Sequence, residues 1–204
     1  MTTLILVRHA QSAPDPALPE RDWPLSELGR LQAAELAPVL AELGVDTLAS
    51  SPFQRAIDTL QPFADRAGLE IGIDEDLRER ALGGWMPDIA DIEAAVRQMH
   101  ADLDFQLEGG ESGRACVERF DAALARVVAA SPGRTIAVGS HGGVLGHLIA
   151  RQGVALPDAF WKRIRNPHLF IFDAGEGLRW IDERTFDGSP LLLTTPAHGL
   201  NTRP

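Results

Sequence analysis

Two histidines stand in this sequence at positions from which they could act together in one reaction. His9 stands two positions after a short aliphatic segment, residues 3–7, and His141 stands two positions after a second one, residues 135–139. Short β-branched and aliphatic runs that end in polar residues are typical of buried strands. Ligands gather at the carboxyl ends of the strands in an open parallel sheet, so we expect both imidazoles to line one crevice.

Two arginines are predicted to join the histidines there. Arg8 immediately precedes His9, and Arg55 falls in the first turn of a helix predicted for residues 51–67. The backbone amides of a helix N-terminus attract anions, and the guanidinium fork matches the oxygens of a phosphate. Taken singly, such residues are usually structural. Together they predict a pocket for a phosphoryl group.

The elements that must position these residues alternate between predicted helices and strands. Helices are expected from the N-cap Ser26 to Gly44, from Ser51-Pro52 to Gly68, from Ser112 to about Ala130, and at about residues 144–152. Further strands are expected at residues 45–50, 69–73, 169–172 and 178–181. Strands joined by helices imply a parallel sheet, so the predicted fold is an α/β three-layer sandwich with a mostly parallel central sheet.

Two segments interrupt this alternation. Four prolines between residues 13 and 25 predict a stiff loop without regular structure that leads directly out of His9. Residues 74–111 contain two Gly-Gly pairs and a helical pattern at about residues 88–105. We therefore expect one domain, residues 1–204, with a helical cap inserted at about residues 74–111.

The composition indicates a globular protein whose partners are small molecules. The 204 residues are 45% hydrophobic, and a formal net charge of −10 opposes binding to nucleic acid or to an anionic membrane. We recognise no signal peptide or membrane span, and Cys116 is the single cysteine, so a cytoplasmic location is expected. His147 stands six positions after His141, a spacing that does not share a helix face, and no metal site is expected. A homodimer is left open.

Six segments, in chain order, resemble the motifs of the histidine phosphatase superfamily, which includes cofactor-dependent phosphoglycerate mutases and fructose-2,6-bisphosphatase. They are residues 6–12 (LVRHAQS), 24–33 (PLSELGRLQA), 50–59 (SSPFQRAIDT), 76–85 (DLRERALGGW), 109–112 (GGES) and 138–144 (VGSHGGV). The resemblance implies transfer of a phosphoryl group to His9 and then to water, with no metal or organic cofactor. It also implies that Glu79 is the general acid and later the general base, while Arg8, Arg55 and His141 form the electrostatic cradle.

Three further positions are assigned to phosphate or substrate binding. Ser12 carries a hydroxyl that could donate to a phosphate oxygen, and Gly142 lies beside His141 in the last motif. Asp15 stands where many members of the family have Asn, and a carboxylate that faces phosphate is repulsive unless it is paired or turned away. We expect Asp15 either to point out of the pocket or to select a substrate with a cationic group.

The predicted function is that of a metal-independent phosphomonoester hydrolase, which acts through phosphohistidine on a small phosphorylated metabolite. One alternative is a phosphotransferase of the phosphoglycerate mutase type, which returns the phosphoryl group to substrate. Mutases of the family carry a larger insertion after the third strand, which favours hydrolysis here. A second alternative is a phosphate-binding module without turnover. The substrate stays open among sugar phosphates, phosphoserine, nucleotides and phosphohistidine proteins.

Overall fold

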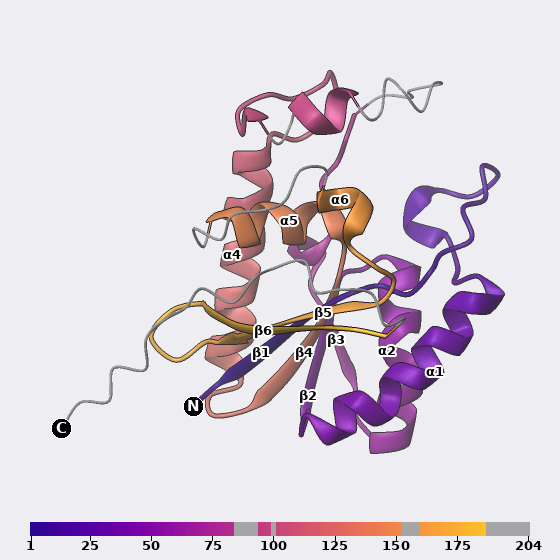
Figure 1. The fold of residues 1–204 in the computed structure, drawn as a ribbon, viewed down its shortest axis with the longest axis vertical. Helices are drawn as coiled ribbons and strands as arrows, with labels where there is room; N and C mark the ends of the chain where they lie inside the picture. Colours follow the sequence, from indigo (N-terminus) through magenta and orange to yellow (C-terminus); the bar gives the residue numbers. More distant parts are fainter. Residues whose placement is uncertain (84–93, 99–100, 152–159, 187–204) are drawn as a thin grey trace.

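The computed structural model describes residues 1–83, 94–98, 101–151 and 160–186. Within these ranges six strands form one sheet in the order β3-β2-β4-β1-β5-β6 (Figure 1). The strands are β1 (Thr3–Arg8), β2 (Thr47–Ser50), β3 (Ile71–Ile73), β4 (Thr135–Ser140), β5 (His168–Asp173) and β6 (Arg179–Thr185). Neighbours among β1 to β4 pair in parallel, whereas β5 is antiparallel to both β1 and β6. The prediction of a mostly parallel sheet is confirmed.

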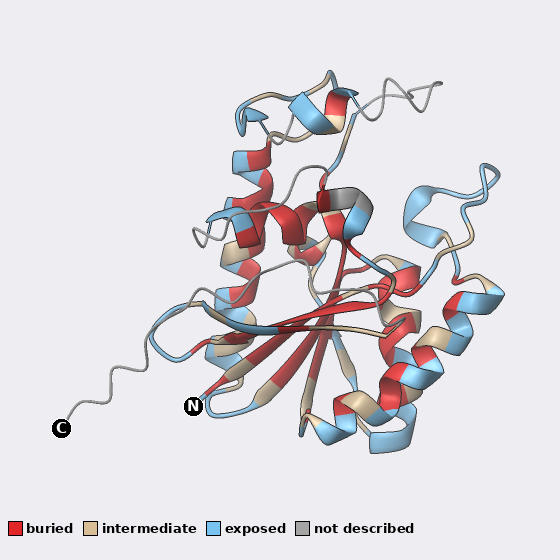
Figure 2. Cartoon of the chain, viewed as in Figure 1, coloured by how far each residue is buried: buried red, intermediate tan, exposed pale blue. Residues whose placement is uncertain are grey.

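Helices cover both faces of this sheet (Figure 1). They are α1 (Glu27–Glu42), α2 (Gln54–Ala67), α4 (Gly113–Ala130), α5 (Gly142–Arg151) and α6 (Phe160–Arg163), with single 3-10 turns at η1 (Glu20–Asp22) and η2 (Glu75–Leu77). Successive side chains of a strand point to opposite faces. Accordingly, Ile5 and Val7 pack with α1 and α2, whereas Leu4 and Leu6 pack with α4 and α5. The buried central strands between two helical layers (Figure 2) confirm the three-layer sandwich.

Serine N-caps begin two of the helices where the sequence predicts them. The side chain of Ser26 accepts a hydrogen bond from the Gly29 amide at 2.9 Å, and that of Ser112 accepts one from the Ala115 amide at 3.1 Å. Each bond satisfies a backbone donor that the helix itself leaves unpaired.

The predicted start of α2 was wrong. The helix begins at Gln54 with Phe53 at its N-cap, not at Ser51-Pro52. The hydroxyl of Ser51 lies 2.8 Å from Nε2 of His141, which follows β4. Ser51 is therefore a hydrogen-bond partner of His141 and not the N-cap of α2.

The loop and the cap differ in how far the structure describes them. Residues 20–22 form the 3-10 turn η1 after Pro19, whose φ of −55° suits entry into such a turn, so the expected absence of regular structure was wrong here. Of the helix expected at residues 88–105, residues 94–98 and 101 are helical, residues 102–105 are not, and residues 84–93 and 99–100 lie outside the described residues. In the described part of the chain, no helix has the length and apolar character needed to cross a bilayer.

The sheet register defines two ends that recur below. At the carboxyl end of β1, Arg8 lies opposite Ser140 of β4 and His168 of β5. At the other end, which we call the amino end, Thr3 lies opposite Asp173 of β5.

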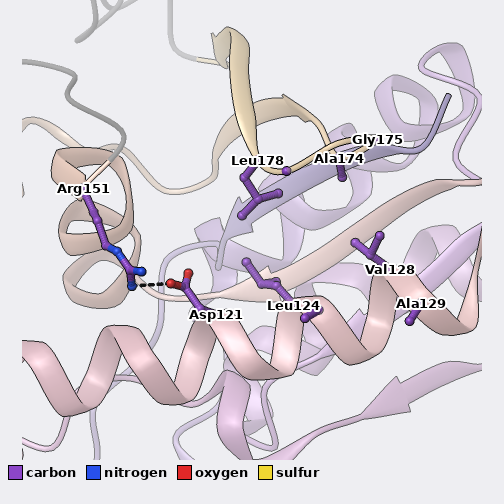
Figure 3. A pocket seen from close by; sticks show the side chains of 10 residues that line it. Asp121, Leu124, Val128, Ala129, Arg151, Ala174, Gly175 and Leu178 are labelled. Carbon is purple, nitrogen blue, oxygen red and sulfur yellow. Dashed lines mark hydrogen bonds and ion pairs between the residues drawn. The ribbon is translucent and has the colours of Figure 1, made fainter.

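A hollow of about 480 Å³ lies at the amino end, between α4, the last turn of α5 and the turn that joins β5 to β6 (Figure 3). Leu124, Val128 and Leu178 line it, and the ion pair between Asp121 and Arg151 stands at its side. The hollow is therefore at the opposite end of the sheet from the predicted site.

Candidate active site

His9 leaves the end of β1 with its backbone held on two sides. Its amide donates to the Ser140 carbonyl at 3.0 Å, and its carbonyl accepts from Nδ2 of Asn166 at 2.6 Å. Only 8% of the residue is exposed. The imidazole therefore projects from a fixed backbone into a nearly closed environment.

The hydrogen bonds of the His9 ring assign its tautomer. Nδ1 lies 2.7 Å from the Ala10 carbonyl, which can only accept, so Nδ1 carries the proton. Nε2 then has a free electron pair and accepts from Nε of Arg55 at 3.2 Å. Burial, with the nearby charges of Arg8 and Arg55, lowers the pKa of His9 to about 3. The ring is thus neutral at physiological pH and presents a nucleophilic nitrogen.

His141, at the end of β4, lies edge-on to His9 with ring centroids 5.3 Å apart. The Ser51 hydroxyl already accepts from the Phe53 amide, so its own hydrogen can be donated to Nε2 of His141 at 2.8 Å. This leaves the proton of a neutral His141 on Nδ1, a buried atom with no hydrogen-bond partner among the described residues. Burial holds the pKa of His141 well below its usual value. The ring can therefore donate to an anion at His9 without being charged.

Arg8 supplies a half-buried cation, with a buried Nε, on the α5 side of the sheet. Its Nη1 donates to the Ile164 carbonyl, whereas its Nε has no partner in the described part of the chain. Burial lowers the pKa of Arg8 to about 10, and the nearby Glu79 opposes that shift, so the guanidinium stays charged near neutral pH. A Cβ at Gly142 would lie 3.1 Å from Nε of Arg8, which explains a glycine at this helix start.

Arg55 is a second cation, fully buried, and all three of its nitrogens are engaged. Besides the bond from Nε to His9, its Nη1 donates to the Glu20 carbonyl and its Nη2 to the Glu20 carboxylate, each at 2.8 Å. The guanidinium also lies over the ring of Phe53 at 4.8 Å. The loop that follows His9 thus folds back onto the arginine that faces the nucleophile.

Glu79 reaches the N-terminus of α5. Its carboxylate accepts from the backbone amides of Arg80 at 2.9 Å, Gly143 at 3.0 Å and Val144 at 2.8 Å. A Cβ at Gly143 would lie 2.8 Å from the carboxylate. The adjacent glycines therefore leave space for two side chains, Gly142 for Arg8 and Gly143 for Glu79. Three amide donors orient both carboxylate oxygens.

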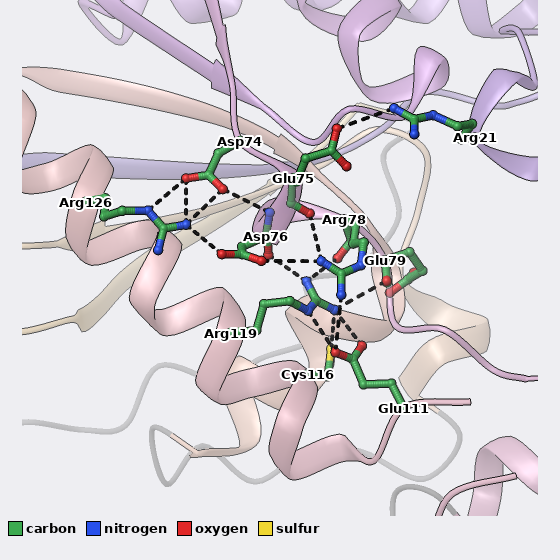
Figure 4. Close-up of polar contacts among 10 residues, drawn as sticks. All are labelled: Arg21, Asp74, Glu75, Asp76, Arg78, Glu79, Glu111, Cys116, Arg119 and Arg126. Atoms are coloured by element: carbon green, nitrogen blue, oxygen red, sulfur yellow. Dashed lines mark hydrogen bonds and ion pairs between the residues drawn. The ribbon is translucent and has the colours of Figure 1, made fainter. Parts of the chain in front are cut away.

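The segment that carries Glu79 is tied to α4 by a network of arginines (Figure 4). Arg119 donates to the Glu111 carboxylate at 2.6 Å and to the Asp76 carbonyl at 2.6 Å, and its side chain is only 9% exposed. Arg126 adds bonds to the Asp74 carboxylate at 2.8 to 3.1 Å. These contacts fix the backbone that leads into Glu79.

Ser12 and Asp15 lie on the loop after His9. The backbone of Ser12 forms an isolated antiparallel bridge with Leu25, which closes the base of the loop. The Asp15 carboxylate is exposed and accepts from the Ala17 amide at 2.9 Å, so it bonds within its own turn. Both roles expected for Asp15, pointing out of the pocket or selecting a cationic substrate, stay predictions.

Three residues at the site were missed from the sequence: Glu20, the Ser51 hydroxyl as a partner of His141, and Asn166. Ser51 belongs to the same motif as Arg55, and a serine at a strand end beside a predicted catalytic crevice was a usable signal. Glu20 and Asn166 belong to loops whose path no local pattern predicts. Among the described residues, no group of three or more His, Cys, Asp or Glu side chains could hold a metal ion.

The sequence and the structure were compared with those of known proteins, and the matches point to the same family. The model of the histidine phosphatase superfamily (branch 1) matches residues 4–184. Glucosyl-3-phosphoglycerate phosphatase of Mycobacterium tuberculosis is 32% identical over 179 residues, which are 79% of each chain. Phosphoglycerate mutase-like protein 4 of Arabidopsis thaliana is 31% identical over 191 residues, 87% of this chain and 81% of the other. A mycobacterial glucosyl-3-phosphoglycerate phosphatase solved with inorganic phosphate superposes with a TM-score of 0.71 at 30% identity, covering 92% and 97% of the two chains.

Proposed function

We propose, from the premise that this chain belongs to the histidine phosphatase superfamily (branch 1), that it is a metal-independent phosphomonoester hydrolase acting through a phosphohistidine at His9. The observation that carries the proposal is the neutral His9 ring, with its proton on Nδ1 and its Nε2 facing Arg55. The substrate is a small phosphorylated molecule.

In the first step, Nε2 of His9 attacks phosphorus, and the bond from phosphorus to the leaving-group oxygen breaks. Nδ1–H of His9 stays bonded to the Ala10 carbonyl, which stabilises the positive charge that develops on the ring. Arg8, Arg55 and Nδ1–H of His141 donate to the phosphoryl oxygens, because these donors lie around the nucleophile. Glu79 acts as the general acid and gives a proton to the leaving alkoxide.

In the second step, water attacks the phosphorus of phosphohistidine. Glu79, now a carboxylate, takes a proton from that water, and the bond from Nε2 of His9 to phosphorus breaks. Inorganic phosphate leaves, and both residues return to their starting states. The three backbone amides on Glu79 keep the carboxylate in one orientation for both steps.

The test is a panel of phosphomonoesters assayed for free phosphate in the presence of a chelator, with wild type and the variants His9→Ala and His9→Gln. Removal of the nucleophile should lower kcat/KM by at least about 10³-fold in both variants. Equal activity in wild type and either variant would overturn the mechanism, and loss of wild-type activity with chelator would overturn metal independence.

Relatives of this chain carry both phosphatase and mutase names, so the same assay includes a mutase arm. A mutase moves the phosphoryl group between positions of the substrate and depends on a bisphosphate primer, whereas a hydrolase releases one phosphate for each substrate consumed. We expect full release of phosphate from 3-phosphoglycerate or any better substrate, without a primer. A phosphate-binding module would bind phosphate and release none.

We further propose that residues 74–111 act as a cap over the site in a single domain. Glu111, at the end of this segment, donates from its amide to the carbonyl of Ala81 within it at 2.8 Å. A cytoplasmic location is part of the same proposal, and fractionation of the native cell tests it. The oligomeric state is tested by light scattering.

A further inference from the structure

The carboxylate of Glu20 stands at the entrance to the site, directly on the buried Arg55. Its side chain is 54% exposed, whereas that of Arg55 is 5% exposed, and the two are joined at 2.8 Å. The same guanidinium donates through Nε to Nε2 of His9 at 3.2 Å. The Arg55 guanidinium therefore links the solvent-exposed carboxylate of Glu20 directly to the nucleophilic Nε2 of His9.

The loop gives this carboxylate little freedom to move away. The Glu20 carbonyl is bonded to Arg55 as well as its side chain, so the backbone itself is anchored. Four prolines between residues 13 and 25 restrict the backbone, and Nε1 of Trp23 donates to the Asp15 carbonyl at 2.9 Å across the loop.

The rest of the loop does not offset the charge. Asp15 and Asp22 are exposed acidic residues on it, and its one basic residue, Arg21, is drawn towards Glu75 at 3.5 Å. Arg8 and Arg55 balance the phosphoryl group itself. A second negative charge on a leaving group that lay beside Arg55 would be repelled by the Glu20 carboxylate, because like charges repel at short range.

We propose that Glu20 is a specificity-determining residue that disfavours leaving groups carrying a carboxylate or a second phosphate and so selects phosphomonoesters of uncharged or amino-bearing alcohols. This inference rests on the proposed hydrolase function. It assigns to Glu20 the selectivity that the sequence suggested for Asp15, whose carboxylate is bonded within its own turn. It also separates this chain from the similar glucosyl-3-phosphoglycerate phosphatases, whose named substrate contains a glycerate.

The experiment compares two probes with the same three-carbon skeleton, glycerol 3-phosphate and 3-phosphoglycerate, which differ in a hydroxymethyl group against a carboxylate. Wild type should favour glycerol 3-phosphate in kcat/KM, and the preference should shrink as salt is added. Glu20→Gln keeps the size of the side chain and removes its charge, and it should shift the ratio about tenfold towards 3-phosphoglycerate. Asp22→Asn, on the same 3-10 turn, makes the same change in net charge and should leave the ratio within about twofold of wild type, since Arg55 is bonded to Glu20 and not to Asp22.

A binding measurement keeps this test separate from the test of turnover. In the His9→Ala background, calorimetry gives dissociation constants of both probes with and without Glu20→Gln, and only 3-phosphoglycerate should bind more tightly in the double variant. An unchanged ratio in both assays would overturn the role of Glu20. If wild type releases phosphate from no monoester while the binding preference shifts as expected, the hydrolase proposal fails and the charge selection by Glu20 stands.

Discussion

The two ends of the sheet contain different kinds of buried space. At the amino end, Leu124, Val128 and Leu178 line a hollow of about 480 Å³ in which the charged neighbours Asp121 and Arg151 pair with each other. At the carboxyl end, buried imidazoles and guanidiniums face one another, and two of their nitrogens have no partner among the described residues. Buried polar groups usually have hydrogen-bond partners, so the unsatisfied donors, not the volume of a hollow, mark where an anion would bind.

The largest effect expected from this comparison is at Arg55. Arg55→Ala removes a preorganised donor beside the nucleophile and should lower kcat/KM by about 10²- to 10³-fold. Arg66→Ala, in the exposed last turn of the same helix, is the matched control and should change kcat/KM by less than about twofold. Similar losses of kcat/KM in both variants would show that catalysis depends on the total charge of α2 and not on the position of Arg55 at the site.

The amino end should respond in stability and not in activity. Leu124 is 1% exposed, and Leu124→Ala should lower the free energy of unfolding by about 2–3 kcal/mol, measured by urea unfolding. Activity for each folded molecule should stay at the wild-type level, because Leu124 lies at the other end of the sheet. Ile181→Ala, at a residue that is 40% exposed, should cost less than about 0.5 kcal/mol. A loss of kcat in folded Leu124→Ala, measured below its unfolding temperature, would contradict the claim that the amino end affects stability and not activity.

A smaller effect sharpens the roles within the carboxyl end. Glu79→Gln should slow the hydrolysis of alkyl phosphates at least about tenfold more than that of p-nitrophenyl phosphate, whose leaving group needs little protonation. Glu75→Gln, at an exposed residue nearby, is the control and should slow both substrates equally or not at all. Equal losses for the two substrates in Glu79→Gln would contradict its role as the acid.

A last effect, on the pH dependence of stability, has opposite signs at the two ends. The pKa of His9 is lowered to about 3, so between pH 6.5 and 3 the unfolded chain binds a proton that the folded chain does not. Its contribution to the free energy of unfolding therefore falls as the pH falls through that window, by up to about 1.4 kcal/mol per pH unit. Burial raises the pKa of Asp121, whose contribution is instead lost as the pH rises through its titration.

Urea unfolding from pH 7 to 4.5 measures this difference. His9→Gln should lose less stability than wild type as the pH falls, and Asp121→Asn should lose more. Parallel curves for wild type and His9→Gln would show that His9 titrates normally in the folded protein.

The sequence predicts the parts of the site that depend on local pattern. Aliphatic runs place His9 and His141 at strand ends, and the helix after β2 places Arg55 in its first turn, although that helix starts two residues later than expected. Glu79 was predicted only from the motif resemblance. In the sequence it stands between Arg78 and Arg80, a pattern typical of a solvated surface.

The parts that could not be predicted depend on contacts between distant segments. Glu20 is 35 residues from Arg55, and Asn166 is 157 residues from His9. Neither residue has a periodicity or a cap that signals its partner, because each contact is set by how a loop crosses the finished sheet. From the sequence, the Ser51 hydroxyl could either cap the following helix or bond to a histidine. The position of β4, which brings His141 to 2.8 Å from it, decides between these roles.

The most direct test of the account is to trap the phosphorylated enzyme. Wild type mixed rapidly with substrate and quenched in alkali should yield, after cleavage at arginine, a phosphorylated peptide of residues 9–21, whose one histidine is His9. The adduct should be stable in alkali and lost in acid, and it should be absent from His9→Gln. Product formation without this adduct, or with phosphate on the peptide that carries His141, would contradict the central claim.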